Sequence, residues 1–273
     1  MTTSVQIQRT PDVQYLLRIG DTCLILGQRL AEWCGHGPAL EEDIAVTNMA
    51  LDLVGQARAL LTHAGELLGQ TSDQTSAQTS AQKLDEDQLA FLRDESDFFN
   101  VTMAELPGGP KDGDFAFTVL RNAMVATLLK LLWERLIDSK DAEVAGIAGK
   151  AVKEARYHQQ HAADWVVRLG DGTPESRRRM EAAVEKLWRY SEEWFEVDAV
   201  DEYAHATGLG PRWADLREAW TSEMHAILED ATLAAPKAST FRSTGKNGVH
   251  SEHMGHLLAT MQSLQRSFPG GVW

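Results

Sequence analysis

The sequence has few cysteines and fewer basic than acidic residues. Its two cysteines, Cys23 and Cys34, lie on one predicted helix. Their spacing corresponds to roughly 16 Å along a helix axis, too far for a disulfide, so we expect both to be small buried apolar residues. The chain has 26 Lys and Arg against 40 Asp and Glu, a net charge of −14. This shortage of positive charge argues against a nucleic-acid partner, because phosphate binding depends on clustered Lys and Arg.

Signals for a membrane segment or for export are also missing. We find no apolar run of the roughly 18–20 residues that a helix needs to cross a bilayer. The N-terminal residues MTTSVQIQRTP lack the apolar region of a signal peptide. The sequence therefore predicts a cytoplasmic protein without a membrane partner. Its 273 residues and its hydrophobic content of 43% favour one large domain.

No segment shows the alternation of apolar and polar residues that is typical of strands, whereas helical spacing is frequent. Long helices are predicted at 12–35, 40–69, 114–138, 141–169, 173–195, 211–233 and 251–267, and a short one at 85–94. The first four long helices suit an antiparallel bundle, and the later helices would pack outside it. The predicted fold class is all-α.

The chain organisation follows from the same pattern. Residues 1–11 are predicted to be a flexible N-terminus and residues 12–273 a single helical domain. Within this domain, the Gln/Ser/Thr-rich residues 70–83 carry too little apolar surface to be ordered by burial. We therefore expect them to form a disordered insert.

Residues 150–161, KAVKEARYHQQH, resemble half of a carboxylate-bridged di-iron site. In such a site, Glu and His three residues apart reach the same metal from one helix face. Here Ala155 stands where that Glu would be, and Glu154 precedes His158 by four residues instead of three. One histidine remains on an otherwise apolar stripe.

The other helices offer few further ligands. The first helix has Glu32 in an inward or boundary position, and the second has Asp52 and Gln56. Two cations inside an apolar bundle must be neutralised by several carboxylates, and this set is too small. We interpret Glu32, Asp52, Gln56, Glu154 and His158 as a degenerate remnant of a metal site. In this interpretation His158 is a core histidine bonded to Glu32, Asp52 or Glu154, and the group fills the space of the metals.

Other motifs carry weaker signals. Glu202 and His205 form a Glu-x-x-His pair without a partner motif, and we interpret it as coincidental. His250, His253 and His256 are three residues apart, but such steps rotate around a helix, which disfavours a zinc site. The glycine-rich segments PGGP (107–110) and STGKNG (243–248) lack a preceding strand and the full phosphate-loop spacing, so turns are expected there.

Four segments carry a resemblance to a known family: RLAEWCGHGP (29–38), LDLVGQAR (51–58), KEARYH (153–158) and TGKNGVHSEHMGHLLATMQSLQRSFPG (244–270). In these segments the chain closely resembles the C subunits of phenylacetyl-CoA epoxidases. The likeness extends from about residue 14 to residue 273. The resemblance implies a ferritin-like bundle with additional C-terminal helices, acting in aerobic phenylacetate breakdown.

In that family, the resemblance implies, a sister subunit holds the di-iron centre and binds the thioester, while the C subunit is its structural partner. The sister has Glu and His where this chain has Leu53 and Gln56, and Glu where it has Ala155. Only His158 and Glu32 match the sister's pattern. The resemblance thus implies that this chain binds no metal or cofactor. Electrons would come from NADPH through a separate reductase subunit with flavin and iron-sulfur groups, and the isolated chain would be inactive.

The resemblance also implies a large apolar and aromatic docking face. We take Trp33, Trp133, Trp188 and Trp194 as candidates for it. Two other interpretations stay open. The chain could be a self-sufficient di-iron oxidase that uses Glu32, Glu154 and His158 with further carboxylates, or a helical adaptor unconnected with oxygenation.

Overall fold

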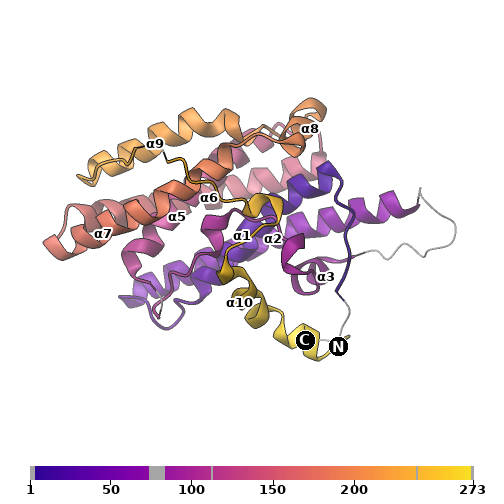
Figure 1. Cartoon of the computed structure of the whole chain (residues 1–273), viewed down its shortest axis with the longest axis horizontal. Helices are drawn as coiled ribbons and strands as arrows, with labels where there is room; N and C mark the ends of the chain where they lie inside the picture. Colours follow the sequence, from indigo (N-terminus) through magenta and orange to yellow (C-terminus); the bar gives the residue numbers. More distant parts are fainter. Residues whose placement is uncertain (1–3, 74–83, 112, 238, 272–273) are drawn as a thin grey trace.

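Four long antiparallel helices form the centre of the molecule (Figure 1). The computed structural model describes residues 4–73, 84–111, 113–237 and 239–271. The central helices are α1 (Pro11–Ala31), α2 (Leu40–Asp73), α5 (Phe115–Leu136) and α6 (Ala142–Gly170). No strand occurs among the described residues, only an isolated bridge between Thr244 and Val249. The predicted all-α class is therefore confirmed, and the four-helix centre agrees with a ferritin-like bundle.

The bundle consists of two helical hairpins, α1 with α2 and α5 with α6. Glycines on α1 let α2 approach closely: a Cβ at Gly20 would lie 3.3 Å from Leu60 Cβ, and one at Gly27 would lie 3.2 Å from the carbonyl oxygen of Ala50. Helix α5 is buried along almost its whole length, from Ala116 to Leu136. The two hairpins therefore enclose one continuous apolar core.

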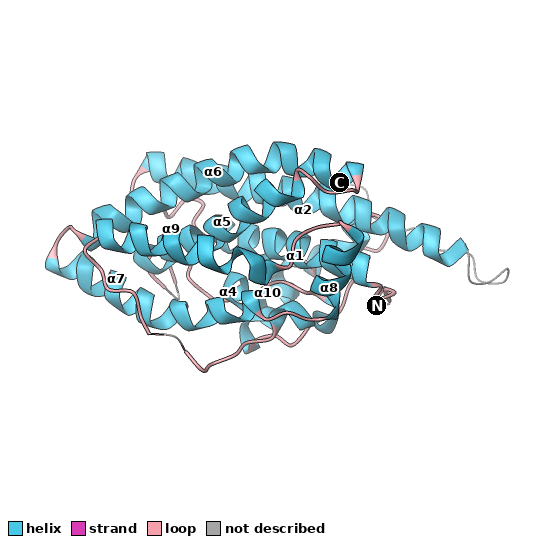
Figure 2. Ribbon diagram, turned by 90° about the horizontal axis from the view of Figure 1, so that it is seen from above, coloured by secondary structure: helices cyan, strands magenta, loops and turns pink. Residues whose placement is uncertain are grey.

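Shorter helices cover this centre. They are α3 (Glu86–Phe91), α4 (Thr102–Glu105), α7 (Pro174–Leu187), α8 (Ala199–Thr207), α9 (Arg217–Asp230), α10 (Glu252–Met261) and α11 (Ser263–Ser267). Helices α7 and α9 lie along the bundle (Figure 2). A tryptophan cluster joins them to it: Trp220 donates a hydrogen bond to the Met124 carbonyl on α5 (3.0 Å), and its ring contacts Trp188 and Trp194. The later helices thus pack outside the bundle, as the sequence predicted.

Several predicted boundaries are wrong in detail. Helix α2 continues past Gly69 to Asp73, into the predicted insert; residues 74–83 of that insert lie outside the described part of the chain. The helix predicted at 173–195 changes at Trp188 into a 3₁₀ helix, Trp188–Phe195. Helices α4 and α8 were not predicted, because each is too short to show a periodic pattern.

Two further expectations need correction. Cys23 is buried, but Cys34 is exposed because α1 ends at Ala31, before that residue. Helix α5 is long and apolar enough to cross a bilayer by composition, although no such segment was expected from the sequence. The most apolar 18-residue stretch of α5 is 83% buried within the molecule, as expected for the central helix of a bundle.

The N-terminal segment has specific contacts from Ser4 onward. Val5 donates its backbone N–H to the Leu92 carbonyl (3.0 Å), and the Arg9 side chain donates to the Asp97 carboxylate (2.7 Å). These bonds tie the segment to residues 92–97, which follow α3.

A buried ion pair fixes that same region to α1. The Asp21 and Arg93 side chains are both fully buried, and Arg93 binds the carboxylate through two nitrogens, one of them 3.0 Å from Oδ2. The same oxygen accepts the N–H of Phe99 (2.9 Å). A fork-shaped pair with its remaining acceptor filled is the geometry that compensates best for the desolvation of two charges.

We predict that Asp21→Asn strongly destabilises the chain. The substitution keeps the volume but leaves the Arg93 guanidinium without a countercharge, a change that costs about 3–5 kcal/mol for buried pairs. Urea denaturation followed by circular dichroism measures the change. Arg58→Ala, which breaks the exposed pair with Glu86, serves as control and should alter the unfolding free energy by no more than about 0.5 kcal/mol. Equal stability of the two variants would contradict the prediction.

Candidate functional site

Four of the five residues interpreted as a metal-site remnant lie on the facing sides of α2 and α6. The exception is Glu32, at the end of α1. His158 Nε2 lies 3.0 Å from Asp52 Oδ2, and Gln56 donates its amide to Glu154 Oε2 at 3.0 Å. Each of these pairs joins α2 to α6. The expectation that His158 is bonded to a carboxylate is met by Asp52.

Glu32 does not belong to this group. It forms the C-cap of α1, where its carboxylate accepts a hydrogen bond from Arg29 at 2.6 Å. The α1 residue that reaches the remnant is Cys23, whose sulfur lies 3.6 Å from Gln56 Oε1. Nine residues separate Cys23 from Glu32, or roughly 13 Å along the helix. Of the inward and boundary positions that the sequence left open for Glu32, the structure has the boundary one: its side chain is 35% exposed at the end of α1, outside the remnant.

Two more pairs extend the contact between α2 and α6 in both directions. His161 Nε2 lies 2.9 Å from Glu42 Oε2, which also accepts the indole N–H of Trp165 at 2.7 Å. At the other end, His63 Nε2 lies 2.8 Å from Oδ2 of Asp141, the N-cap of α6. We call the four contacts Glu42–His161, Asp52–His158, Gln56–Glu154 and His63–Asp141 the polar seam. In the polar seam each imidazole or amide has its own acidic partner.

The protonation of the central groups follows from their burial. Burial lowers the pKa of His158, and it outweighs the hydrogen bond and the charge of Asp52. Burial likewise raises the pKa of the Cys23 thiol, with a further contribution from the charge of Glu154. Near neutral pH both side chains are thus uncharged, and neither provides a reactive thiolate or a fixed positive charge.

The donor set does not fit a pair of iron ions. A di-iron bundle site draws four carboxylates and two imidazoles from its four helices. Here the interior positions Leu53 and Ala155 are apolar, and Gln56 contributes an amide. In the part of the chain that the structure describes, no three His, Cys, Asp or Glu side chains converge as metal ligands would. The acidic groups that are present already bond to neighbours in the polar seam.

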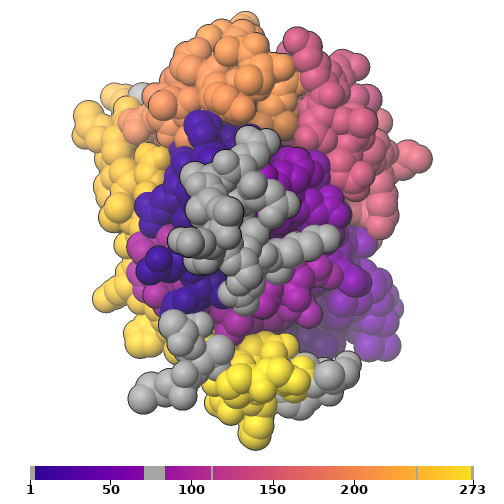
Figure 3. All heavy atoms as spheres, turned by 90° about the vertical axis from the view of Figure 1, so that its right-hand side faces the viewer, coloured from indigo at the N-terminus to yellow at the C-terminus, as the bar shows by residue number. Residues whose placement is uncertain are grey.

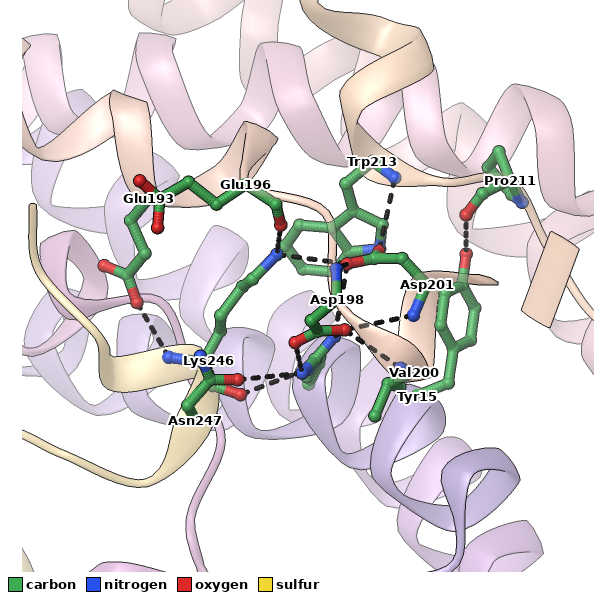
Figure 4. A network of polar contacts seen from close by, with 11 residues as sticks. Tyr15, Glu193, Glu196, Asp198, Val200, Asp201, Pro211, Trp213, Lys246 and Asn247 are labelled. Atoms are coloured by element: carbon green, nitrogen blue, oxygen red, sulfur yellow. Dashed lines mark hydrogen bonds and ion pairs between the residues drawn. The ribbon is translucent and has the colours of Figure 1, made fainter. Parts of the chain in front are cut away.

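A second cluster of charged groups surrounds the STGKNG segment (Figure 4). Lys246 is buried, and its ammonium group donates to Asp201 Oδ2 (3.2 Å) and to the Glu196 carbonyl. Its backbone N–H donates to Glu193 Oε1 at 2.7 Å, and the N–H of Gly245 donates to Thr102 Oγ1 at 3.1 Å. These donors are engaged within the protein, so the segment does not form a phosphate-binding loop.

Arg18 of α1 completes this cluster. It donates to both carboxylate oxygens of Asp198, to the Lys246 carbonyl (3.1 Å) and to Asn247 Oδ1 (2.9 Å). Burial opposes ionisation of Asp198, but the hydrogen bond and charge of Arg18 outweigh it and hold its pKa at about 2. Burial raises the pKa of Asp201 despite the nearby positive charges. The cluster connects α1, α8 and the C-terminal segment, and its groups satisfy one another.

The remaining sequence candidates are separated or buried. Glu202 pairs with Arg212 at the surface, which agrees with a coincidental Glu-x-x-His motif. His250 lies against Glu105, away from the exposed His256. The tryptophans proposed for a docking face, Trp33, Trp133, Trp188 and Trp194, are all buried in the core, so that proposal is wrong.

Comparisons with known proteins agree with the sequence resemblance. A family model described as "Phenylacetic acid catabolic protein" matches residues 1–273. The C subunit of the 1,2-phenylacetyl-CoA epoxidase of Escherichia coli (strain K12) is 44% identical over 259 residues, which cover 95% of this chain and 98% of that relative. The similarity therefore extends over nearly the full length of both chains.

We predict that His158 makes the chain sensitive to acid. Because its folded-state pKa is depressed, the unfolded chain takes up a proton below about pH 6.5 that the folded chain does not, and stability falls as the pH drops. The variant His158→Gln removes this contribution, about 1.4 kcal/mol for each unit of depression. Urea denaturation at pH 7.5 and pH 5.5 should show a smaller loss in this variant than in the native chain. The exposed His256→Gln is the control; an unchanged loss in His158→Gln would refute the prediction.

Proposed function

Because the chain belongs to the family of phenylacetic acid catabolic proteins, we propose that it is a structural, non-catalytic subunit of a multicomponent oxygenase. That oxygenase would insert one atom of dioxygen into the aromatic ring of phenylacetyl-CoA to give the epoxide. The chain would pair with a catalytic subunit that holds the di-iron centre. The full-length similarity to the C subunit of an epoxidase supports the assignment to such a complex.

The observation that carries the non-catalytic role is the make-up of the polar seam. Where a di-iron subunit needs two carboxylates and an imidazole, this chain has the apolar Leu53 and Ala155 and the Gln56 amide, all of them buried. The acids nearest to these positions, Asp52 and Glu154, are hydrogen-bonded to His158 and Gln56. Unbalanced positive charge in such a site would be strongly unfavourable. In the proposal, therefore, no residue of this chain touches dioxygen or the thioester.

A stripe of exposed apolar side chains on α2 supports a docking role. Leu40, Ile44, Leu51 and Val54 are exposed, and Leu51 keeps 64% of its surface open to solvent. At 100° per residue, these four positions lie within an arc of roughly 80° on one side of the helix. Apolar stripes of this kind commonly mark contacts with another protein.

The stripe borders a groove between α2 and α6. The groove has a volume of about 240 Å³ and is lined by Gly55, Gln56, Ala59, Glu143, Gly146, Ile147, Lys150, Ala151 and Glu154. A Cβ at Gly55 or Gly146 would meet no atom within 4 Å. Farther along α6, Tyr157 is half-exposed. Small residues in the groove would let a helix of the partner approach closely, with larger apolar side chains beside it.

The cofactors of the reaction would be bound elsewhere in the complex. In the proposal, NADPH delivers electrons through a reductase subunit with flavin and iron-sulfur groups, and the catalytic subunit holds the iron. We also propose that the complex works in the cytoplasm, without nucleic acid or membrane partners. The net charge of the chain, −14, agrees with the absence of a nucleic-acid partner, because phosphate binding needs positive charge.

Two other functions fit the structure less well. A self-sufficient di-iron oxidase would have to bind iron with its own side chains, and the donor set described above argues against it. A helical adaptor outside oxygenation is disfavoured by the 44% identity to an epoxidase subunit over almost the whole chain.

We predict that Leu51→Glu disrupts the complex without unfolding the chain. A charge at the centre of an apolar interface commonly weakens association by about 2 kcal/mol or more, which is about a thirtyfold loss in affinity. Co-expression with the catalytic subunit, followed by size-exclusion chromatography, measures complex formation. NADPH consumption that depends on phenylacetyl-CoA and the reductase measures function, and both should fall together.

The matched control is Leu264→Glu on α11, which also places a charge at a half-exposed leucine but lies off the stripe. It should leave complex formation and NADPH consumption unchanged. If Leu51→Glu binds the partner as tightly as the native chain, the α2 stripe is not the docking face. If the native chain neither binds the partner nor supports its activity, the proposed function itself is wrong.

A further inference from the structure

A buried histidine joins the C-terminal part of the chain to α4. His250 immediately precedes Ser251, the N-cap of α10. Its Nδ1 lies 2.7 Å from Glu105 Oε2, and its Nε2 lies 2.9 Å from the Phe98 carbonyl oxygen. The side chains of His250 and Glu105 are both fully buried. We call residues 243–261, which contain His250 and α10, the C-terminal arm.

The partners of this histidine determine its protonation. A carbonyl oxygen only accepts hydrogen bonds, so Nε2 must carry a proton. Glu105 accepts a hydrogen bond at both carboxyl oxygens, at Oε1 from the N–H of Ser251 (2.6 Å) and at Oε2 from the amide of Asn100 (2.9 Å). Nδ1 must then donate as well. An imidazole with two donating nitrogens is an imidazolium cation.

The charges around the ring favour this cation. Glu105 faces it from α4, Glu95 from the 3₁₀ helix Glu95–Asp97, and Glu252 and His253 follow it on α10. Arg29 of α1 donates to the carbonyl oxygen of Glu105 at 2.9 Å and to that of His253 at 3.5 Å. Burial opposes the charged ring, but the hydrogen bond and charge of Glu105, the Phe98 carbonyl and the charge of Glu95 outweigh it and raise the pKa of His250.

We propose that protonated His250 is a clasp that holds the C-terminal arm against α4 and residues 98–100, and that deprotonation loosens the arm. A neutral imidazole can donate from only one nitrogen, so it would set an unprotonated nitrogen against either the Glu105 carboxylate or the Phe98 carbonyl. Such a buried contact between two acceptors is repulsive. The arm would then separate from this site more easily than the rest of the fold unfolds.

Besides the clasp, the helical part of the arm is held by the Arg29 contact to His253 and, just after α10, by Gln262, which donates to the carbonyl oxygens of Ala90 and Arg93. Of the ten residues of α10, only Met254, Leu257 and Leu258 are buried. The C-terminal residues, yellow in Figure 3, lie at the lower edge of that view of the molecule, outside the bundle. A short helix with few buried side chains is the kind of segment that opens at low free energy. The clasp therefore decides whether α10 stays closed against the molecule. The first residues of the arm are held separately, by the ion pair between Lys246 and Asp201.

The direction of the pH effect follows from the raised pKa. The contribution of the clasp is complete below the pKa of the free histidine, about 6.5, and is lost as the pH rises through the higher folded-state value. Each unit of elevation corresponds to a tenfold change in the equilibrium between closed and open arm. This dependence is opposite in sign to that of His158, whose folded-state pKa is lowered.

Two measurements on the full-length chain test the proposal. Nitrogen-15 NMR of the labelled histidines, with His250→Gln used to assign the signal, should show both ring nitrogens of His250 protonated at pH 7. Hydrogen exchange, corrected for the intrinsic pH dependence of the rate, should show the protection of amides 254–261 falling about tenfold or more from pH 6 to pH 9. Amides in α5 should keep their protection over this range.

Variants separate the clasp from a purely structural role. Glu105→Gln lets a neutral His250 accept a hydrogen bond at Nδ1, so protection of the arm should no longer depend on pH. The exposed His256→Gln should keep the native dependence. A neutral His250 ring at pH 7, or equal protection of the arm at pH 6 and pH 9 in the native chain, would overturn the proposal even if the variants fail to fold.

Discussion

The polar seam between α2 and α6 is the constraint on which our account depends. In a di-iron bundle, the acids at this level would point at metal ions, and their mutual repulsion would be balanced by the positive charge of those ions. In this chain the balance comes from within the protein. His158 lies against Asp52, and Gln56 lies against Glu154, so hydrogen bonds replace coordination. In the proposal, these bonds join α2 to α6 where a metal-binding subunit would use its cofactor.

Buried charge pairs play a related role at the periphery. Asp21–Arg93, Asp201–Lys246 and Glu105–His250 each join a segment outside the bundle to a central or neighbouring helix. In each pair the acid also accepts a backbone N–H, from Phe99, Trp213 and Ser251 respectively. Pairs satisfied in this way specify one position for irregular segments, which apolar contacts alone would define poorly. The C-terminal arm is one such segment, and its position depends on protonation.

Much of the fold could be predicted from the sequence because its signals are local. Apolar spacing predicted the long helices, and the start of α7 has local signals of the same kind, since Thr173 is its cap and Pro174 its first residue. The boundary at Trp188 could not be predicted, because the buried residues 188, 191 and 194 are three apart, a spacing that over so short a stretch fits an α-helix as well as a 3₁₀ helix. The stripe on α2 was recognisable in principle, since a helix with a second apolar face signals a second partner.

The site was only partly predictable, because its contacts join distant parts of the chain. Asp52 and His158 are 106 residues apart, and Glu105 and His250 are 145 apart. No spacing rule brings such residues together. Periodicity gave the face of α1 that carries Glu32 but not the level at which α1 ends, so it could not show that Glu32 lies outside the polar seam. Cys23 was missed as a neighbour of Gln56 for the same reason.

The central claim is that the interior of this bundle holds hydrogen-bonded pairs in place of metal ions. Anomalous diffraction at the iron absorption edge, from crystals of the complete complex grown with ferrous iron, tests it most directly. Our account predicts strong paired peaks in the catalytic subunit and no peak between α2 and α6 of this chain. A pair of well-occupied iron ions bound by Asp52, Glu154 and His158 would contradict it.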